Sequence, residues 1–134
     1  MKFYLASRFE RRKELQGYAQ QLEKLGHTIT ARWLDPAFGH QITEGDQVSQ
    51  AFNEQLATED LEDIDNCSDF VVFMPGGSRG GMNVELGYAI ALRRVFGNHP
   101  RIYVISGHTN VFTYLKFIYH YKDFEDFSIN FQTR

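Results

Sequence analysis

The sequence predicts an α/β protein in which helices cover both faces of a mostly parallel sheet. Short apolar runs, typical of buried strands, alternate along the chain with segments of helical spacing, and this order predicts parallel strands joined by helices. The chain has 134 residues, of which 43% are hydrophobic. We therefore expect one domain, 1–134, with a core of its own.

The individual elements follow from apolar runs, helical periodicity and glycine stops. We expect strands at 2–6, 27–34, 69–74, 101–106 and 117–121. We expect helices at 8–25, 46–66 and 82–96, with short ones at 110–115 and 123–131. A long loop at 35–45 and a glycine-rich turn at 75–81 complete the chain.

Composition excludes several classes of protein. Fourteen Lys and Arg against 17 Asp and Glu give a net charge of −3, which argues against a nucleic acid partner. A single cysteine, Cys67, permits no disulfide framework and fits a cytoplasmic location. The five histidines have no metal-ligand spacing, and no apolar window is long enough to cross a membrane. We expect no metal, no cofactor and no membrane partner.

The glycine-rich run Gly76-Gly77-Ser78-Arg79-Gly80-Gly81 lies between a predicted central strand and a predicted helix. Backbone N–H groups at such a helix start attract anions, and glycines allow a ligand to approach the backbone closely. The spacing matches neither the dinucleotide-binding motif nor the phosphate-binding P-loop. Gly77, Ser78, Arg79 and Gly81 are therefore candidate substrate-binding residues, and a plain structural turn is the alternative.

Glu85 is the only charged residue from Val84 to Leu92, in a helix that is otherwise apolar. Burying a carboxylate costs free energy unless the group is paired or used. A helix N-terminus favours the ionised form, which can act as a nucleophile or base. The alternative is a glutamate that only satisfies N–H groups at the helix start.

Four further candidates come from the expected fold. Asp60 lies between Leu56 and Ile64 on the inward side of its helix, although it could also belong to a solvated acidic face. Tyr4 is at the middle of the first strand, where a core aromatic is the alternative. Ser7 and Arg8 follow the end of that strand, and ligands of parallel sheets bind beyond the carboxyl ends of the strands.

Five segments carry a resemblance to a known family. They are Phe3-Tyr4-Leu5-Ala6-Ser7, Leu25-Gly26-His27-Thr28-Ile29, Glu59-Asp60-Leu61 with Ile64, Asn83-Val84-Glu85-Leu86-Gly87-Tyr88-Ala89, and Asn110-Val111-Phe112 with Tyr114-Leu115. In this order they resemble the nucleoside 2-deoxyribosyltransferase family and related nucleotide N-glycosidases. The segment around Glu85 is the most specific, since it resembles the helix start that carries the family's nucleophile.

The resemblance implies a flavodoxin-like, Rossmann-like three-layer sandwich with a five-stranded, mostly parallel sheet. It also implies cleavage or transfer of the N-glycosidic bond of nucleosides or their 5′-monophosphates. Glu85 would form a covalent glycosyl-enzyme, as in retaining glycosidases, and Asp60 would serve the departing base as acid and base. Tyr4 would orient Glu85, and Asn110 would complete the site of a neighbouring subunit.

Arg79 departs from the family pattern, which has Asp or Ser at this position. An arginine fork suits a phosphate, so this residue favours a nucleotide over a free nucleoside, unless its side chain points into solvent. Two alternatives to the transferase stay open: a nucleoside 5′-monophosphate N-glycohydrolase that uses water, and a nucleotide-binding sensor without turnover.

Aromatic residues are concentrated late in the chain. Nine lie between Tyr103 and Phe131, more than a late edge strand and a short helix are expected to bury within one subunit. Aromatic side chains are enriched in interface cores. With the resemblance, this pattern predicts a homodimer or higher homo-oligomer with part of 103–131 between subunits.

Overall fold

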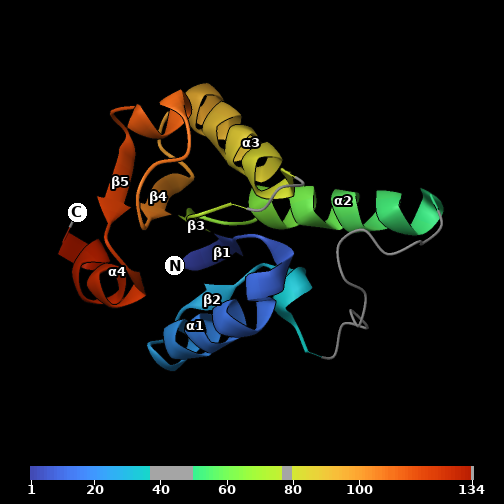
Figure 1. Cartoon of the computed structure of the whole chain (residues 1–134), viewed down its shortest axis with the longest axis horizontal. Helices are drawn as coiled ribbons and strands as arrows, with labels where there is room; N and C mark the ends of the chain where they lie inside the picture. Colours follow the sequence, from blue (N-terminus) through green and yellow to red (C-terminus); the bar gives the residue numbers. More distant parts are fainter. Residues whose placement is uncertain (37–49, 77–79, 134) are drawn as a thin grey trace.

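Five parallel strands form one sheet in the order β2-β1-β3-β4-β5, as seen in the computed structural model (Figure 1). The described residues are 1–36, 50–76 and 80–133. The strands are β1 (Lys2–Ala6), β2 (Thr28–Ile29), β3 (Asp69–Phe73), β4 (Arg101–Ile105) and β5 (Ile118–Tyr121). The predicted fold class is confirmed, and every strand pair is parallel.

Helices cover both faces of this sheet (Figure 1). They are α1 (Arg12–Lys24), α2 (Gln50–Asp65), α3 (Gly81–Phe96) and α4 (Phe124–Asn130). On one face α1 meets α4, where the rings of Tyr18 and Phe124 stack at 4.1 Å. On the other face α2 meets α3, and the Tyr88 hydroxyl donates to Asp65 at 2.6 Å.

The pleat of β1 sends neighbouring side chains to opposite faces, as in any strand. Phe3 packs edge-on against Phe127 and Phe131 on the α4 side. Tyr4 points to the α2–α3 side, where its hydroxyl reaches Glu85. One strand thus supplies both the centre of the core and the floor of the candidate site.

The predicted strand at 27–34 is much shorter in the structure. β2 pairs with only the first residues of β1, and the chain then turns into a 3-10 helix over Arg32–Leu34. The indole N–H of Trp33 donates to the Leu5 carbonyl at 3.0 Å. Side-chain hydrogen bonds therefore replace the backbone ladder that a longer edge strand would have formed.

Most of the late aromatic residues are covered by their own chain, although two of them stay exposed, and the homo-oligomer stays a prediction. Five of the nine are buried against the sheet: Tyr103, Tyr121, Phe124, Phe127 and Phe131. Phe112 and Tyr114 stay 60% and 68% exposed. The aromatic count alone therefore does not require a partner subunit.

Other sequence expectations concern membranes, metals and the single thiol. No helix in the described part of the chain is both long and apolar enough to cross a membrane. Within the same residues no three His, Cys, Asp or Glu side chains gather in a way that could hold a metal ion. Cys67 is buried, and this burial raises the pKa of its thiol to about 12, so the group is a poor nucleophile. The cytoplasmic location stays a prediction.

Replacing Phe127 tests the core between β1 and α4. Phe127 has no exposed surface and contacts several rings, so Phe127→Ala should lower the free energy of unfolding by about 3–5 kcal/mol. Ile129→Ala on the same helix is the control, because Ile129 is 67% exposed. Urea unfolding followed by circular dichroism measures both, and equal losses in the two variants would contradict this account of the core.

Candidate active site

The candidate site lies where β1 is covered by α2 and α3. The Tyr4 hydroxyl donates a 2.5 Å hydrogen bond to Glu85 Oε2, across 81 positions of sequence. Tyr4 is fully buried, and Glu85 is partly buried. Burial, followed by the charges of Glu85 and Asp60, holds the pKa of Tyr4 well above its usual value. The hydroxyl therefore keeps its proton and acts as a permanent donor.

Glu85 owes its position to the start of α3. Gly80 has φ +79°, a left-handed conformation that favours glycine, and Gly81 opens the helix. Glu85 therefore lies one full turn inside α3, deeper than the sequence predicts. Because the effect of a helix dipole fades after the first turn, the Tyr4 hydroxyl is the stronger stabilising contact.

Asp60 faces the same region from α2. The pKa of this carboxyl is raised to about 7, first by burial and then by the charges of Asp63 and Glu59, while Arg32 opposes the change. Asp60 also raises the pKa of Tyr4, which shows that the two groups are close enough to interact. The structure thus brings together the predicted trio of Tyr4, Asp60 and Glu85.

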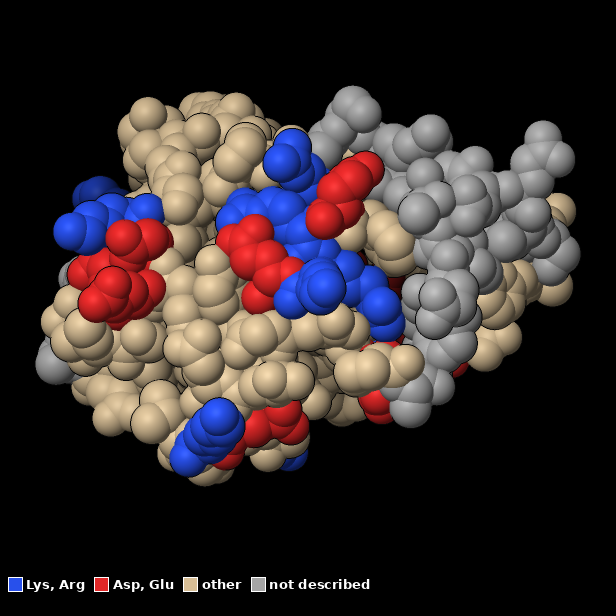
Figure 2. Space-filling view, turned by 60° about the horizontal axis from the view of Figure 1, so that its bottom comes forward, with Lys and Arg blue, Asp and Glu red and all other residues tan. Residues whose placement is uncertain are grey.

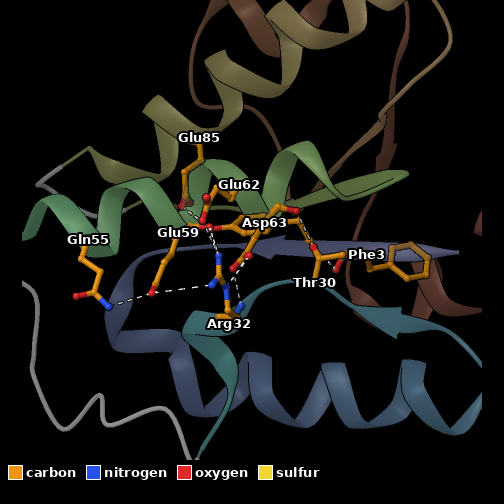
Figure 3. Close-up of polar contacts among 9 residues, drawn as sticks. Phe3, Thr30, Arg32, Gln55, Glu59, Glu62, Asp63 and Glu85 are labelled. Carbon is orange, nitrogen blue, oxygen red and sulfur yellow. Dashed lines mark hydrogen bonds and ion pairs between the residues drawn. The ribbon is translucent and has the colours of Figure 1, made fainter.

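Two charged residues beside the trio were not predicted from the sequence. Arg32 Nε donates to Asp63 Oδ1 at 2.8 Å, and its backbone N–H donates to Asp63 Oδ2 at 2.8 Å (Figure 3). Neither residue is a candidate on the sequence alone. Two sequence features could have pointed to them: an arginine within the strand-like run 27–34, and an acid next to the buried Ile64.

Ser7 and Arg8 lie at the carboxyl end of β1, as expected. The Ser7 hydroxyl is buried and donates to the Phe73 carbonyl at 3.2 Å, which joins the ends of β1 and β3. Arg8 is exposed. Arg11 Nη1 donates to the Met74 carbonyl at 3.0 Å, just before the glycine-rich run. In Figure 2, which brings the α1 side forward, Lys and Arg gather near the centre with Asp and Glu between them.

The remaining candidates have different positions. Gly81 is exposed at the start of α3, whereas Gly77, Ser78 and Arg79 lie outside the described residues. Asn110 is exposed and caps the 3-10 helix Val111–Tyr114, where its Oδ1 accepts from the Phe112 N–H at 2.9 Å. Its side chain therefore has a local role within its own chain.

An open hollow of about 570 Å³ lies beside Arg32. Its lining comprises Thr30, Arg32, Glu62, Asp63, Asp65 and Asn66. None of the predicted trio contributes to this lining. The hollow therefore adjoins the trio only through Arg32 and Asp63, and size alone does not identify a reaction centre.

Comparison with known proteins agrees with this fold. Neither a protein-family model nor a curated protein sequence matches the chain. The fold matches solved structures of enzymes named for deoxyribosyl transfer and for nucleotide N-glycoside cleavage. At the identities involved, this likeness establishes the fold alone.

The first solved structure is a 2-deoxyribosyltransferase from Bacillus psychrosaccharolyticus, with a TM-score of 0.65 and 22% sequence identity. The match covers 94% of this chain and 89% of that enzyme. The second is the CMP N-glycosidase BcmB of Clostridium botulinum, with a TM-score of 0.57 and 14% identity over 100% of both chains. The flavodoxin-like sandwich is thus shared over nearly the whole length.

Asp60 should make stability depend on pH. Its pKa is about 7 in the folded protein against about 3.9 unfolded, so the folded state binds its proton more tightly. The resulting stability is complete below about pH 4 and is lost as the pH rises through 7. Asn carries no charge, so its stability lacks this dependence on pH. From pH 4.5 to pH 8 the free energy of unfolding of Asp60→Asn should therefore rise by about 1–3 kcal/mol relative to that of the wild type, allowing for partial solvent screening.

Urea unfolding at pH 4.5 and pH 8 measures this difference. Thr58→Ala, an uncharged change on the exposed side of α2, is the control and should show the same offset from the wild type at both pH values. An Asp60→Asn offset that is equally constant with pH would show that this carboxyl is not held as described.

Proposed function

We propose that the protein cleaves or transfers the N-glycosidic bond of (2′-deoxy)nucleosides or their 5′-monophosphates. The observation that carries this proposal is the Tyr4–Glu85 hydrogen bond beside a carboxyl, Asp60, that titrates near neutral pH. The motif around Glu85 and the fold likeness to enzymes of both classes support it. Glu85 is the proposed nucleophile and Asp60 the proposed acid and base.

In the first step a Glu85 carboxylate oxygen attacks the anomeric carbon of the sugar. The bond from this carbon to the base breaks, and its electron pair stays on the base nitrogen. Asp60 is partly protonated at pH 7, so it can transfer a proton to this leaving group. The product is a free base and a sugar esterified to Glu85, as in retaining glycosidases.

In the second step an acceptor attacks the same carbon and releases Glu85. Asp60, now ionised, takes a proton from the acceptor, which returns both carboxyl groups to their starting states. A second nucleobase as acceptor gives transfer, and water gives hydrolysis. Tyr4 keeps its hydroxyl proton throughout and holds Glu85 in one orientation by donating to Oε2.

The proposed substrate is an anionic nucleotide in preference to a free nucleoside. Arg79 lies in a glycine-rich run ahead of a helix, and Arg8 is exposed at the carboxyl end of β1. Guanidinium groups bind phosphate through paired, charge-assisted hydrogen bonds. Arg8, Arg79 and Ser78 are the proposed phosphate contacts, while Ser7 and the glycines at 77 and 81 would shape the site.

A homodimer or larger homo-oligomer remains part of this proposal. Apolar side chains are exposed on α3 and on the 3-10 helix Val111–Tyr114, notably those of Val84, Val95, Phe112 and Tyr114. Exposed apolar surface of this kind is typical of subunit contacts. Asn110, next to Phe112, is the proposed residue that approaches the site of a neighbouring subunit.

Incubation with deoxynucleosides and their 5′-monophosphates tests the function directly. Free base should appear, and chromatography with and without a second base distinguishes transfer from hydrolysis. Release that needs the second base identifies a transferase, and release in water alone identifies a glycohydrolase. Binding of nucleotides without any release would favour a sensor on the same fold.

Glu85→Gln should abolish nearly all turnover. The variant keeps the shape of the side chain but lacks the attacking charge, so kcat should fall by about 10³-fold or more. Glu23→Gln, an exposed acid on α1, is the matched control and should keep the wild-type rate. A folded Glu85→Gln protein with near-normal kcat would exclude the covalent mechanism.

Arg79→Ala tests the choice of substrate. The KM for a monophosphate should rise by about 10- to 100-fold, since a hydrogen bond to a charged group is worth ~1.5–3 kcal/mol. The KM for the corresponding nucleoside should change far less. Arg94→Ala, an exposed arginine on α3, is the control. Equal losses on both substrates would assign Arg79 to the base or to structure.

A further inference from the structure

Arg32 holds three acidic residues of α2 that surround Asp60 in the sequence (Figure 3). Its Nε lies 2.8 Å from Asp63 Oδ1, and its Nη2 donates to Glu62 Oε1 at 3.1 Å. The same Nη2 reaches the Glu59 carbonyl at 3.4 Å, and Nη1 lies 3.9 Å from Glu59 Oε1. One side chain therefore contacts residues of α2 that precede and follow Asp60 in the sequence.

Further contacts fix both partners of this interaction, α2 and the segment that carries Arg32. Asp63 is 4% exposed, so its carboxylate depends on Arg32 for compensation of its charge. Thr30 Oγ1 donates to the Asp63 backbone carbonyl at 2.8 Å and adds a second tie between the same segments. The segment after β2 is in turn fixed to β1 by the bond from Trp33 to the Leu5 carbonyl.

We propose that Arg32 is a positioning residue for Asp60: its guanidinium fixes the turn of α2 that carries this carboxyl and keeps a positive charge beside it. The inference rests on the proposed function, in which Asp60 transfers the proton. Arg32 belongs to the segment after β2, whereas Tyr4 and Glu85 come from β1 and α3. It would act on the reaction only through Asp60.

The charges around Asp60 determine in which direction its pKa should move when Arg32 is replaced. The titratable and charged groups that act on Asp60 directly or through Tyr4 are Glu59 and Asp63 on α2, Arg32 after β2, Tyr4 on β1 and Glu85 on α3. Glu59 and Asp63 favour the protonated carboxyl, as burial does, and Arg32 favours the ionised one. Loss of the guanidinium should therefore leave Asp60 protonated to a higher pH.

The test is a carbon-13 NMR titration of the Asp60 carboxyl in the whole protein without substrate, with the signal assigned from Asp60→Asn. Arg32→Gln should move the midpoint upward by about 1 pH unit, at the low end of what an adjacent opposite charge contributes. Arg12→Gln is the matched control. Arg12 also holds this segment, through the carbonyls of Trp33 and Asp35 rather than through acidic side chains of α2.

The activity of the same variants separates position from charge. Arg32→Gln should lower kcat by about 10-fold or more with little change in KM, and the pH–rate limb should move with the Asp60 midpoint. Arg32→Lys keeps the charge but cannot form the several hydrogen bonds that the planar guanidinium donates. Its midpoint should stay near that of the wild type while kcat still falls, and it serves as the folded variant if Arg32→Gln does not fold.

An Asp60 midpoint that is unchanged in Arg32→Gln, or that moves equally in Arg12→Gln, would overturn the proposal. So would an Arg32→Lys protein with wild-type kcat. The titration needs no turnover, so a wild-type protein that releases no base from any nucleotide would refute the proposed function while the midpoint still reported on Arg32.

Discussion

The crowding of carboxyl groups between α2, β1 and α3 is the constraint around which this side of the molecule is organised. Asp60, Asp63 and Glu85 come from two helices and all act on Tyr4 of β1, while Glu59 acts on Asp60. Such a group of acids is stable only if some of them are paired and others keep a proton. Arg32 pairs with Asp63, and Tyr4 donates to Glu85. Asp60 is left with a proton that it can exchange near neutral pH.

The strand pattern could be predicted from the sequence wherever strands are buried on both faces. β3 and β4 are central and almost wholly buried, so they appear as unbroken apolar runs. The segment 27–34 has a similar composition but lies at the edge of the sheet, where only two residues pair. There the side chains of Arg32 and Trp33 decide the backbone path, and their partners lie far away in the sequence.

Separation along the sequence also limits how much of the site could be predicted. Glu85 could be predicted because a single charge in an apolar helix is conspicuous, and Asp60 because of its spacing from Leu56 and Ile64. The pairing of Arg32 with Asp63 spans 31 positions and depends on η2, the 3-10 helix Arg32–Leu34, packing against α2. In the sequence Asp63 was one acid in an acidic run, which is typical of a solvated helix face.

The packed rings of Phe3, Phe127 and Phe131 connect β1 with α4 and the residue that follows it. Its consequence concerns the order in which the protein can fold during synthesis. β1 is made well before α4, because Phe127 and Phe131, two of the residues whose rings cover Phe3, lie 124 and 128 positions further along the chain. Until α4 is made, α1 covers only part of that apolar face of the sheet, and apolar surface left exposed in this way is prone to aggregation. Slow translation between β1 and α4 would therefore prolong the period in which the nascent chain depends on chaperones.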